Sequence, residues 1–151
     1  MSESNLCEYF FGDELQKRLT VLKENGYQFL GVSICQTCAL SHYLEATFSN
    51  KVLNRVVRAN YLPSTNECPD VLKIFVEIER KNSFSIDEFL RFMGRPNNVI
   101  ESVNINAYEG DEKNRLSMCL DNFNRVLRDD LQRIISGVDW IDVPIVWDDY
   151  K

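Results

Sequence analysis

Three cysteines and the single histidine are the residues of this chain most able to do chemistry. Cys35 and Cys38 form a Cys-x-x-Cys pair, His42 follows shortly after, and Cys68 lies further on. Such a pair, placed after a strand and at a helix N-terminus, is typical of thiol–disulfide exchange, because the helix lowers the pKa of the first thiol. Residues 27–34 supply a strand, but residues 39–48 favour a second strand over a helix. The pattern therefore favours buried structural thiols over a redox centre using Cys35 and Cys38.

The same residues could in principle bind a structural zinc ion, but the context of a zinc site is missing. Cys35, Cys38, His42 and Cys68 are four potential ligands, the number that a structural zinc needs. The flanking glycines and the second compact ligand pair of a zinc knuckle are missing. Pairs of carboxylates occur without a phosphate-binding loop or a nucleophile elbow beside them, at Glu77/Glu79, Asp129/Asp130 and Asp148/Asp149. We therefore expect no enzyme activity, no metal and no cofactor.

The C-terminal fifteen residues combine aromatic rings with carboxylates. Both tryptophans of the chain lie there, together with one tyrosine and four aspartates. Aromatic side chains supply contact area in interfaces, and carboxylates steer a basic partner. The expected partner-binding residues are Trp140, Trp147, Tyr150, Asp139, Asp142, Asp148, Asp149, and also Asp129 and Asp130 just upstream. The competing interpretation is that Trp140 folds back to complete the core, because tryptophan is on average highly buried.

The negative charge is concentrated in the same part of the chain. Net charge is −6, and residues 100–151 hold 11 acidic and 6 basic side chains, whereas residues 1–99 hold 12 and 11. A nucleic-acid-binding protein needs the opposite balance, because it must neutralise phosphates. The charge therefore indicates a basic protein partner and no nucleic acid. A solvated acidic surface that serves only solubility is the alternative.

The length and composition are those of one globular domain spanning residues 1–151. No run of 18 consecutive apolar residues is present, so we expect no membrane helix. The N-terminus lacks the pattern of a signal peptide. Five cysteines are an odd number in a chain of 151 residues, unlike the even count of a small secreted disulfide scaffold. We therefore expect reduced thiols and a cytoplasmic location.

Hydrophobic periodicity predicts the elements that must position these residues. Helical spacing predicts helices over 13–26, 85–94 and 111–136, the second beginning with the capping box Ser85-Ile-Asp-Glu88. Strands are expected at 27–34, 42–48, 52–62 and 71–80, with a fifth at 99–108 that has a short helix as its alternative. After Gly137 the chain should continue as an edge strand or an extended arm, because Pro144 cannot donate to a ladder.

Short connections between successive strands favour an antiparallel meander. The expected fold is therefore α+β, with a four- to five-stranded meander sheet packed on one face by helices. Arg55 and Arg58 lie on opposite faces of their strand, because their separation is odd. We expect them to pair with Glu45 and Glu77 on neighbouring strands and not to bind phosphate.

The order of these elements resembles the small bacterial immunity proteins of contact-dependent inhibition and other polymorphic toxin systems. The resemblance lies in a helix over 15–27 leading into the sheet, the strand over 52–61, the helix over 85–94 after the sheet, and the acidic tail. It covers most of the chain, includes no diagnostic motif and transfers no functional residue. It implies binding to a cognate toxin, often a basic nuclease, and blockage of the toxin's active site. An adaptor or chaperone for a secreted protein is the alternative non-enzymatic function.

Overall fold

Five strands pair in chain order to form an antiparallel meander, β1-β2-β3-β4-β5. The computed structural model describes residues 8–36, 42–65, 68–78 and 82–144. The strands are β1 (Gln28–Gln36), β2 (His42–Asn50), β3 (Arg55–Leu62), β4 (Val71–Ile78) and β5 (Asn82–Ser85). This arrangement confirms the predicted α+β class, the meander and the placement of the first four strands.

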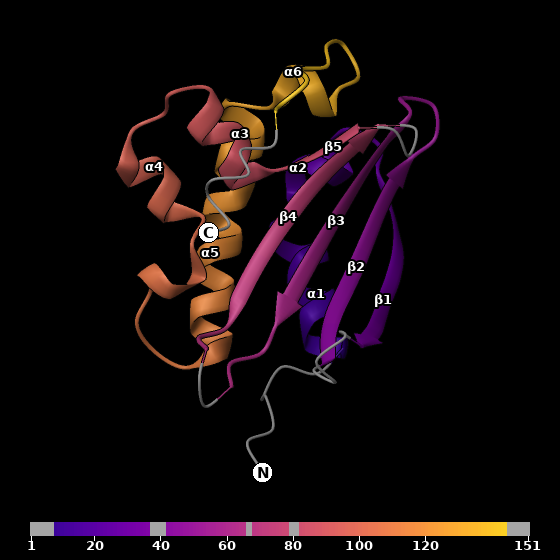
Figure 1. Ribbon diagram of the computed structural model, residues 1–151. Helices are drawn as coiled ribbons and strands as arrows, with labels where there is room; N and C mark the ends of the chain where they lie inside the picture. Colours follow the sequence, from indigo (N-terminus) through magenta and orange to yellow (C-terminus); the bar gives the residue numbers. More distant parts are fainter. Residues whose placement is uncertain (1–7, 37–41, 66–67, 79–81, 145–151) are drawn as a thin grey trace.

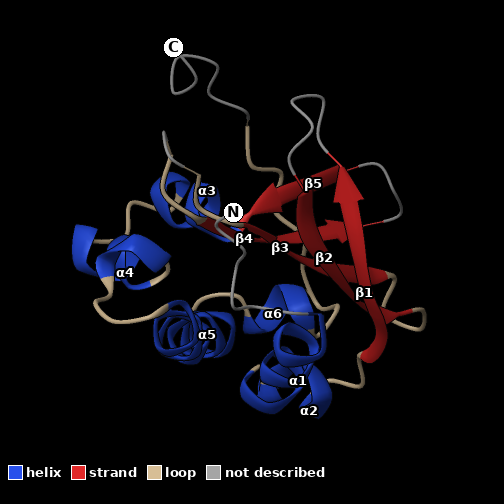
Figure 2. Cartoon of the chain, turned by 90° about the horizontal axis from the view of Figure 1, so that it is seen from below, coloured by secondary structure: helices blue, strands red, loops and turns tan. Residues whose placement is uncertain are grey.

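Helices cover one face of this sheet, as the alternation of apolar residues predicts (Figure 2). They are α1 (Glu8–Arg18), α2 (Thr20–Glu24), α3 (Ile86–Phe92), α4 (Asn97–Ser102), α5 (Glu112–Asp129) and α6 (Gln132–Ile135), with a 3₁₀ turn η1 (Ile105–Ala107). The long helix α5 crosses behind the sheet beside α1 and α2, while α3 and α4 lie on the β5 side (Figure 1). The core fills the space between these two layers.

Every second residue of the central strands enters that core. On β3 the buried residues include Val57, Ala59 and Tyr61, and on β4 they include Ile74 and Val76. The helices contribute the facing apolar side chains, of which Phe11, Leu15, Leu116, Leu120 and Phe123 are almost completely buried. Because strand side chains alternate between faces, this register fixes which strand residues meet the helices and which point away from them.

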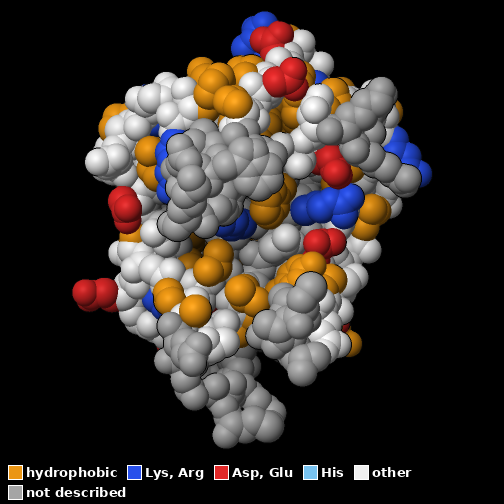
Figure 3. All heavy atoms as spheres, in the orientation of Figure 1, with side chains coloured by type: hydrophobic (Ala, Val, Ile, Leu, Met, Phe, Trp, Pro, Cys, Tyr) orange, Lys and Arg blue, Asp and Glu red, His pale blue; other side chains and the backbone are white. Residues whose placement is uncertain are grey.

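The opposite face of the sheet carries charges that neutralise one another. Arg58 lies 3.1 Å from Glu77 on β4 and 3.6 Å from Glu45 on β2, as predicted. Basic and acidic side chains accordingly lie next to each other over the sheet (Figure 3). Arg55, in contrast, is buried on the helix-covered face and bonds neither glutamate, so that part of the prediction was wrong.

The N-terminal helical region begins earlier than the sequence suggested. α1 begins at Glu8, and a break at Leu19 separates it from α2, whereas we expected one helix over 13–26. Gly12 lies inside α1, where a Cβ atom would come within 3.1 Å of Val32 Cγ2 on β1. A glycine within a helix argues against helix formation in isolation, but here it permits close packing of α1 on β1.

The predicted strand over 99–108 is wrong, because this segment forms α4 and η1. Local hydrogen bonds explain the difference. The Ser102 hydroxyl donates to the Val99 carbonyl, and the Asn104 side chain accepts from the Asn106 amide. Such side-chain bonds give the backbone an alternative to a strand ladder. The fifth strand is instead β5, immediately before α3.

The other two helices are where the sequence placed them. Ser85 caps α3 by accepting the Glu88 amide proton at 3.3 Å, which confirms half of the predicted capping box; the Glu88 carboxylate accepts from the Ser85 hydroxyl, at 2.7 Å, in place of the Ser85 backbone N–H. The predicted helix over 111–136 is divided: α5 ends at Asp129, and the shorter α6 follows. Beyond α6, the described residues 138–144 form an arm without strand pairing.

Candidate partner-binding site

Arg55 holds the start of the C-terminal arm against the sheet. Its side chain, on the core face at the beginning of β3, is only 5% exposed. The guanidinium donates to four backbone carbonyls, those of Leu53, Asn54, Ile134 and Asp139, at 3.0–3.2 Å. A buried cation is tolerated only when such partners replace water. Arg55 therefore ties together the β2–β3 turn, the end of α6 and the arm.

Gly137 makes this close approach possible. Its φ of +81° lies in the left-handed region, and a Cβ atom there would come within 3.0 Å of Leu53 Cδ2. Glycine ends helices in this conformation at little cost. The predicted helix stop at Gly137 is confirmed, and its second role is to let the arm pass over the β2–β3 turn.

Trp140 is fixed in position by this arrangement. The Arg55 guanidinium lies 5.3 Å from the indole centroid, and the Phe84 ring lies 5.2 Å from it. The indole N–H donates to the Asp142 carboxylate at 3.0 Å. Trp140 is partly buried against the core, so it both completes the packing and leaves part of its ring at the surface.

The predicted carboxylates divide into two groups. Asp139 pairs with Arg133 at 2.6 Å, and Asp130 pairs with Arg95 at 3.1 Å. Asp129 and Asp142 are exposed, and no cation of the described residues lies within ion-pair distance of either. Of the four predicted aspartates that the structure describes, two are thus ion-paired, and Asp129 and Asp142 have no cationic partner among the described residues.

These residues lie at one end of the molecule. The C-terminal end of α5, the short α6 and the beginning of the arm meet at the top of Figure 1. Elements far apart in sequence are thereby brought together, as the bonds of Arg55 to both Asn54 and Asp139 show. The remaining predicted site residues, Trp147, Asp148, Asp149 and Tyr150, lie outside the residues that the structure describes.

Of the Cys-x-x-Cys pair, the structure describes only the first thiol, Cys35. Cys35 is in β1 opposite Tyr43 of β2, and a hydrogen bond between the two raises the pKa of Tyr43. β2 begins at His42, so the residues that would continue the helix of a thiol–disulfide motif after the Cys-x-x-Cys pair form a strand. Cys38 itself lies outside the described residues. Among the residues described, no cluster of three or more His, Cys, Asp or Glu side chains could hold a metal ion.

A buried polar network that the sequence did not reveal joins β3, α5 and the loop before β4. Asp70 is 2% exposed and receives two hydrogen bonds from Arg115, at 2.8 and 2.9 Å. The Tyr61 hydroxyl donates to the same carboxylate at 2.9 Å, and burial together with Asp70 raises the pKa of Tyr61. The sequence signal was weak, because nothing in the spacing of a loop aspartate and a helix arginine predicts their contact.

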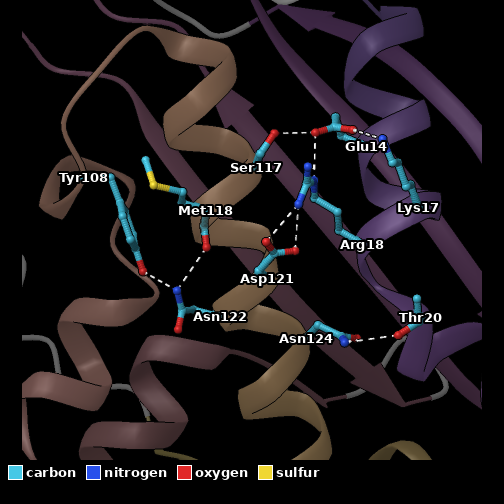
Figure 4. Close-up of polar contacts among 10 residues, drawn as sticks. All are labelled: Glu14, Lys17, Arg18, Thr20, Tyr108, Ser117, Met118, Asp121, Asn122 and Asn124. Carbon is cyan, nitrogen blue, oxygen red and sulfur yellow. Dashed lines mark hydrogen bonds and ion pairs between the residues drawn. The ribbon is translucent and has the colours of Figure 1, made fainter.

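A second network connects α1 to α5 (Figure 4). Glu14 is 6% exposed, accepts from Arg18 at 2.8 Å and from the Ser117 hydroxyl, and lies 4.0 Å from Lys17. Arg18 also pairs with Asp121 at 2.8 Å. Although burial disfavours the charged form, these hydrogen bonds lower the pKa of Glu14. Both networks are internally satisfied and join elements of the fold, so they are structural.

A hollow of about 260 Å³ lies between β4, α3 and α4. It is smaller than the roughly 300–1,000 Å³ of most small-molecule sites. Its charged lining includes Asp87, which pairs with Arg91 at 3.3 Å and lies 4.0 Å from Lys73.

In the described part of the chain, no helix has both the length and the apolar character needed to cross a membrane. Comparison of the chain with protein-family models, curated proteins and solved structures gave no match.

Proposed function

We propose that this protein is a non-enzymatic binding protein whose C-terminal end captures a basic protein, in the manner of a bacterial immunity protein and its toxin. The observation that carries the proposal is the fixed indole of Trp140 next to the exposed carboxylate of Asp142, which has no cationic partner among the described residues. Its N–H bonds Asp142 at 3.0 Å, while Arg55 and Phe84 hold the ring. A partly exposed indole that is already ordered loses little entropy on binding.

The position of the acidic residues on α5 supports the same function. Asp129 and Asp130 are at the C-terminal end of α5. The negative end of the helix dipole disfavours carboxylates there, typically by about 0.3–1 kcal/mol. Arg95 offsets the charge of Asp130, but no described cation offsets that of Asp129. Residues that cost local stability are expected where they serve binding.

The charge of the chain would speed the encounter with such a partner. Complementary charge raises association rates and imposes a salt dependence, while aromatic residues at the centre of an interface supply most of the affinity. Asp142 and Asp129 would provide the steering, and Trp140 would provide the anchor. Asp139 has a positioning role, because its carbonyl accepts from Arg55 and its carboxylate pairs with Arg133.

The direct test is protection of cells. The product of the gene adjacent to this one is expressed with and without this protein, and growth is measured. We expect the neighbouring product to inhibit growth, this protein to restore it, and Trp140→Ala to weaken protection. A neighbouring product that neither inhibits growth nor binds this protein would eliminate the immunity function, and recovery of a secretion component in a stable complex would favour an adaptor.

A further inference from the structure

The two edge strands of the sheet, β5 and β1, differ in length and in how far they are covered. β5 is only four residues long, continues directly into α3, and has Phe84 covered by Trp140 at 5.2 Å. β1 is nine residues long and, within the part of the chain that the structure describes, pairs only with β2. Figures 1 and 2 show no described element along the outer side of β1. One edge is thus short and covered, while the other is long and open.

The open edge also lacks the usual protection against pairing. Proteins generally place charges, proline or bulges on exposed edge strands. β1 reads Gln-Phe-Leu-Gly-Val-Ser-Ile-Cys-Gln, without charge or proline, although 26% of the chain is charged and β2, β3 and β4 each carry charged residues. A bulge between Phe29 and Gly31 affects only its beginning.

Apolar side chains are exposed along this strand. Leu30 is 59% exposed and Ile34 is 56% exposed. After the bulge, Val32 and Ile34 pair with Ala46 and Leu44, so both lie on the core side of the sheet. After Gly31, which has a φ of +123° and ends the bulge, the segment 32–36 is an uncharged strand with Val32 and Ile34 on one face.

We propose that β1 pairs with β1 of a second copy of this chain, antiparallel and about a two-fold axis at Ser33, to form a continuous ten-stranded sheet. In this register Val32 of each copy lies opposite Ile34 of the other, and Gly31 of each copy lies opposite Cys35 of the other. An axis at Ile34 would instead place Val32 opposite the polar Gln36, and an axis at Val32 would bring the bulge into the pairing. An isologous contact of this kind closes at two subunits and leaves no further open β1 edge.

The second copy fits because the strand is complementary to itself. No like charges face each other across the axis, since β1 has none. Main-chain hydrogen bonds supply the pairing, as in other cases of strand addition, and apolar pairs directly opposite each other stabilise it. The dimer leaves Trp140 and Asp142 free, because Trp140 packs on β5 at the other edge of the sheet.

Sedimentation of the full chain over a range of concentrations tests this proposal. We expect a dimer that dissociates on dilution, and a shift of its dissociation constant by at least about tenfold towards monomer in Ile34→Lys. Phe92→Lys on α3, at a side chain of similar exposure (50%), is the matched control and should remain dimeric. A wild-type chain that stays monomeric, or an Ile34→Lys chain that stays dimeric, would overturn the proposal.

Disulfide trapping tests the register independently. In a chain with Cys7, Cys35, Cys38 and Cys68 changed to Ser, Ser33→Cys is compared with Ser83→Cys on β5 in the presence of oxidised glutathione. Residues directly opposite in antiparallel strands have Cα atoms about 4.5–5.5 Å apart, which a disulfide can bridge. We expect a covalent dimer from Ser33→Cys and none from Ser83→Cys. Cross-linking through Ser83→Cys alone, or through neither, would contradict pairing about Ser33.

Discussion

The Arg55 guanidinium packs against the Trp140 ring, 5.3 Å from its centroid, and so links the beginning of β3 to the C-terminal arm. One buried cation thereby fixes both the arm and the indole that we assign to partner binding. The contact is worth about 2 kcal/mol when desolvated, in addition to the hydrogen bonds that the same side chain makes.

Replacing Arg55 should destabilise the protein and release Trp140. We expect Arg55→Met to lower the free energy of unfolding by about 2–4 kcal/mol, because buried carbonyls lose their donor. In a Trp147→Phe background, the fluorescence of Trp140 should move towards that of a solvated indole. Arg125→Met, at an exposed position on α5, should change stability by less than about 0.5 kcal/mol. Equal stability of the two variants in urea unfolding would show that Arg55 does not hold the arm.

Removing one partner of the Asp70–Arg115 pair should lower the free energy of unfolding more than replacing both partners. Asp70→Asn leaves Arg115 without its carboxylate, and we expect a loss of about 3–5 kcal/mol in urea unfolding, as for other buried pairs. Adding Arg115→Met to this variant should recover part of the loss, because it removes the uncompensated cation. Strictly additive losses in the double variant would indicate that the two side chains are not energetically coupled.

The sequence was sufficient for the first four strands of the sheet and insufficient for β5 and for the contacts that hold the arm. Alternation at 42–48 and 71–80 reports directly which residues face the core, so β2 and β4 could be predicted. Arg55 could not, because its partners are backbone carbonyls contributed by Ile134 and Asp139, which only the tertiary fold brings near. The strand expected at 99–108 failed because Ser102 and Asn104 bond the local backbone, which a pattern of apolar residues does not report.

Stability should depend on pH through Glu14. The pKa of its carboxyl is lowered in the folded protein below the value of 4.5 that it has in the unfolded chain. Stabilisation by Glu14 is therefore fully present above pH 4.5 and is lost as the pH falls through the pKa of Glu14 in the folded protein. Between about pH 6 and about pH 3 the unfolding free energy of Glu14→Gln should fall less steeply than that of the wild type. Parallel pH profiles would mean that Glu14 is not held by Arg18 and Ser117.

The thiols should differ in reactivity according to their burial. Burial, with a smaller contribution from Asp70, raises the pKa of Cys119 to about 12, whereas Cys68 is exposed. In a chain with Cys7, Cys35 and Cys38 changed to Ser, a disulfide reagent such as dithionitrobenzoate should modify Cys68 rapidly. Cys119 should react only in urea, because the thiolate is the reactive form. Equal rates for the two thiols in the native protein would contradict the burial of Cys119.

The central claim is that Asp142 beside Trp140, together with Asp129 at the end of α5, steers a basic partner onto the C-terminal end. It is tested most directly by the association rate with the product of the adjacent gene, measured for Asp129→Asn/Asp142→Asn. The control is Glu8→Gln/Asp13→Asn, which removes the same charge from exposed positions on α1. At low salt we expect the first variant to associate roughly tenfold more slowly than the wild type and the control to differ little. Equal slowing of both variants, or slowing of neither, would contradict the account.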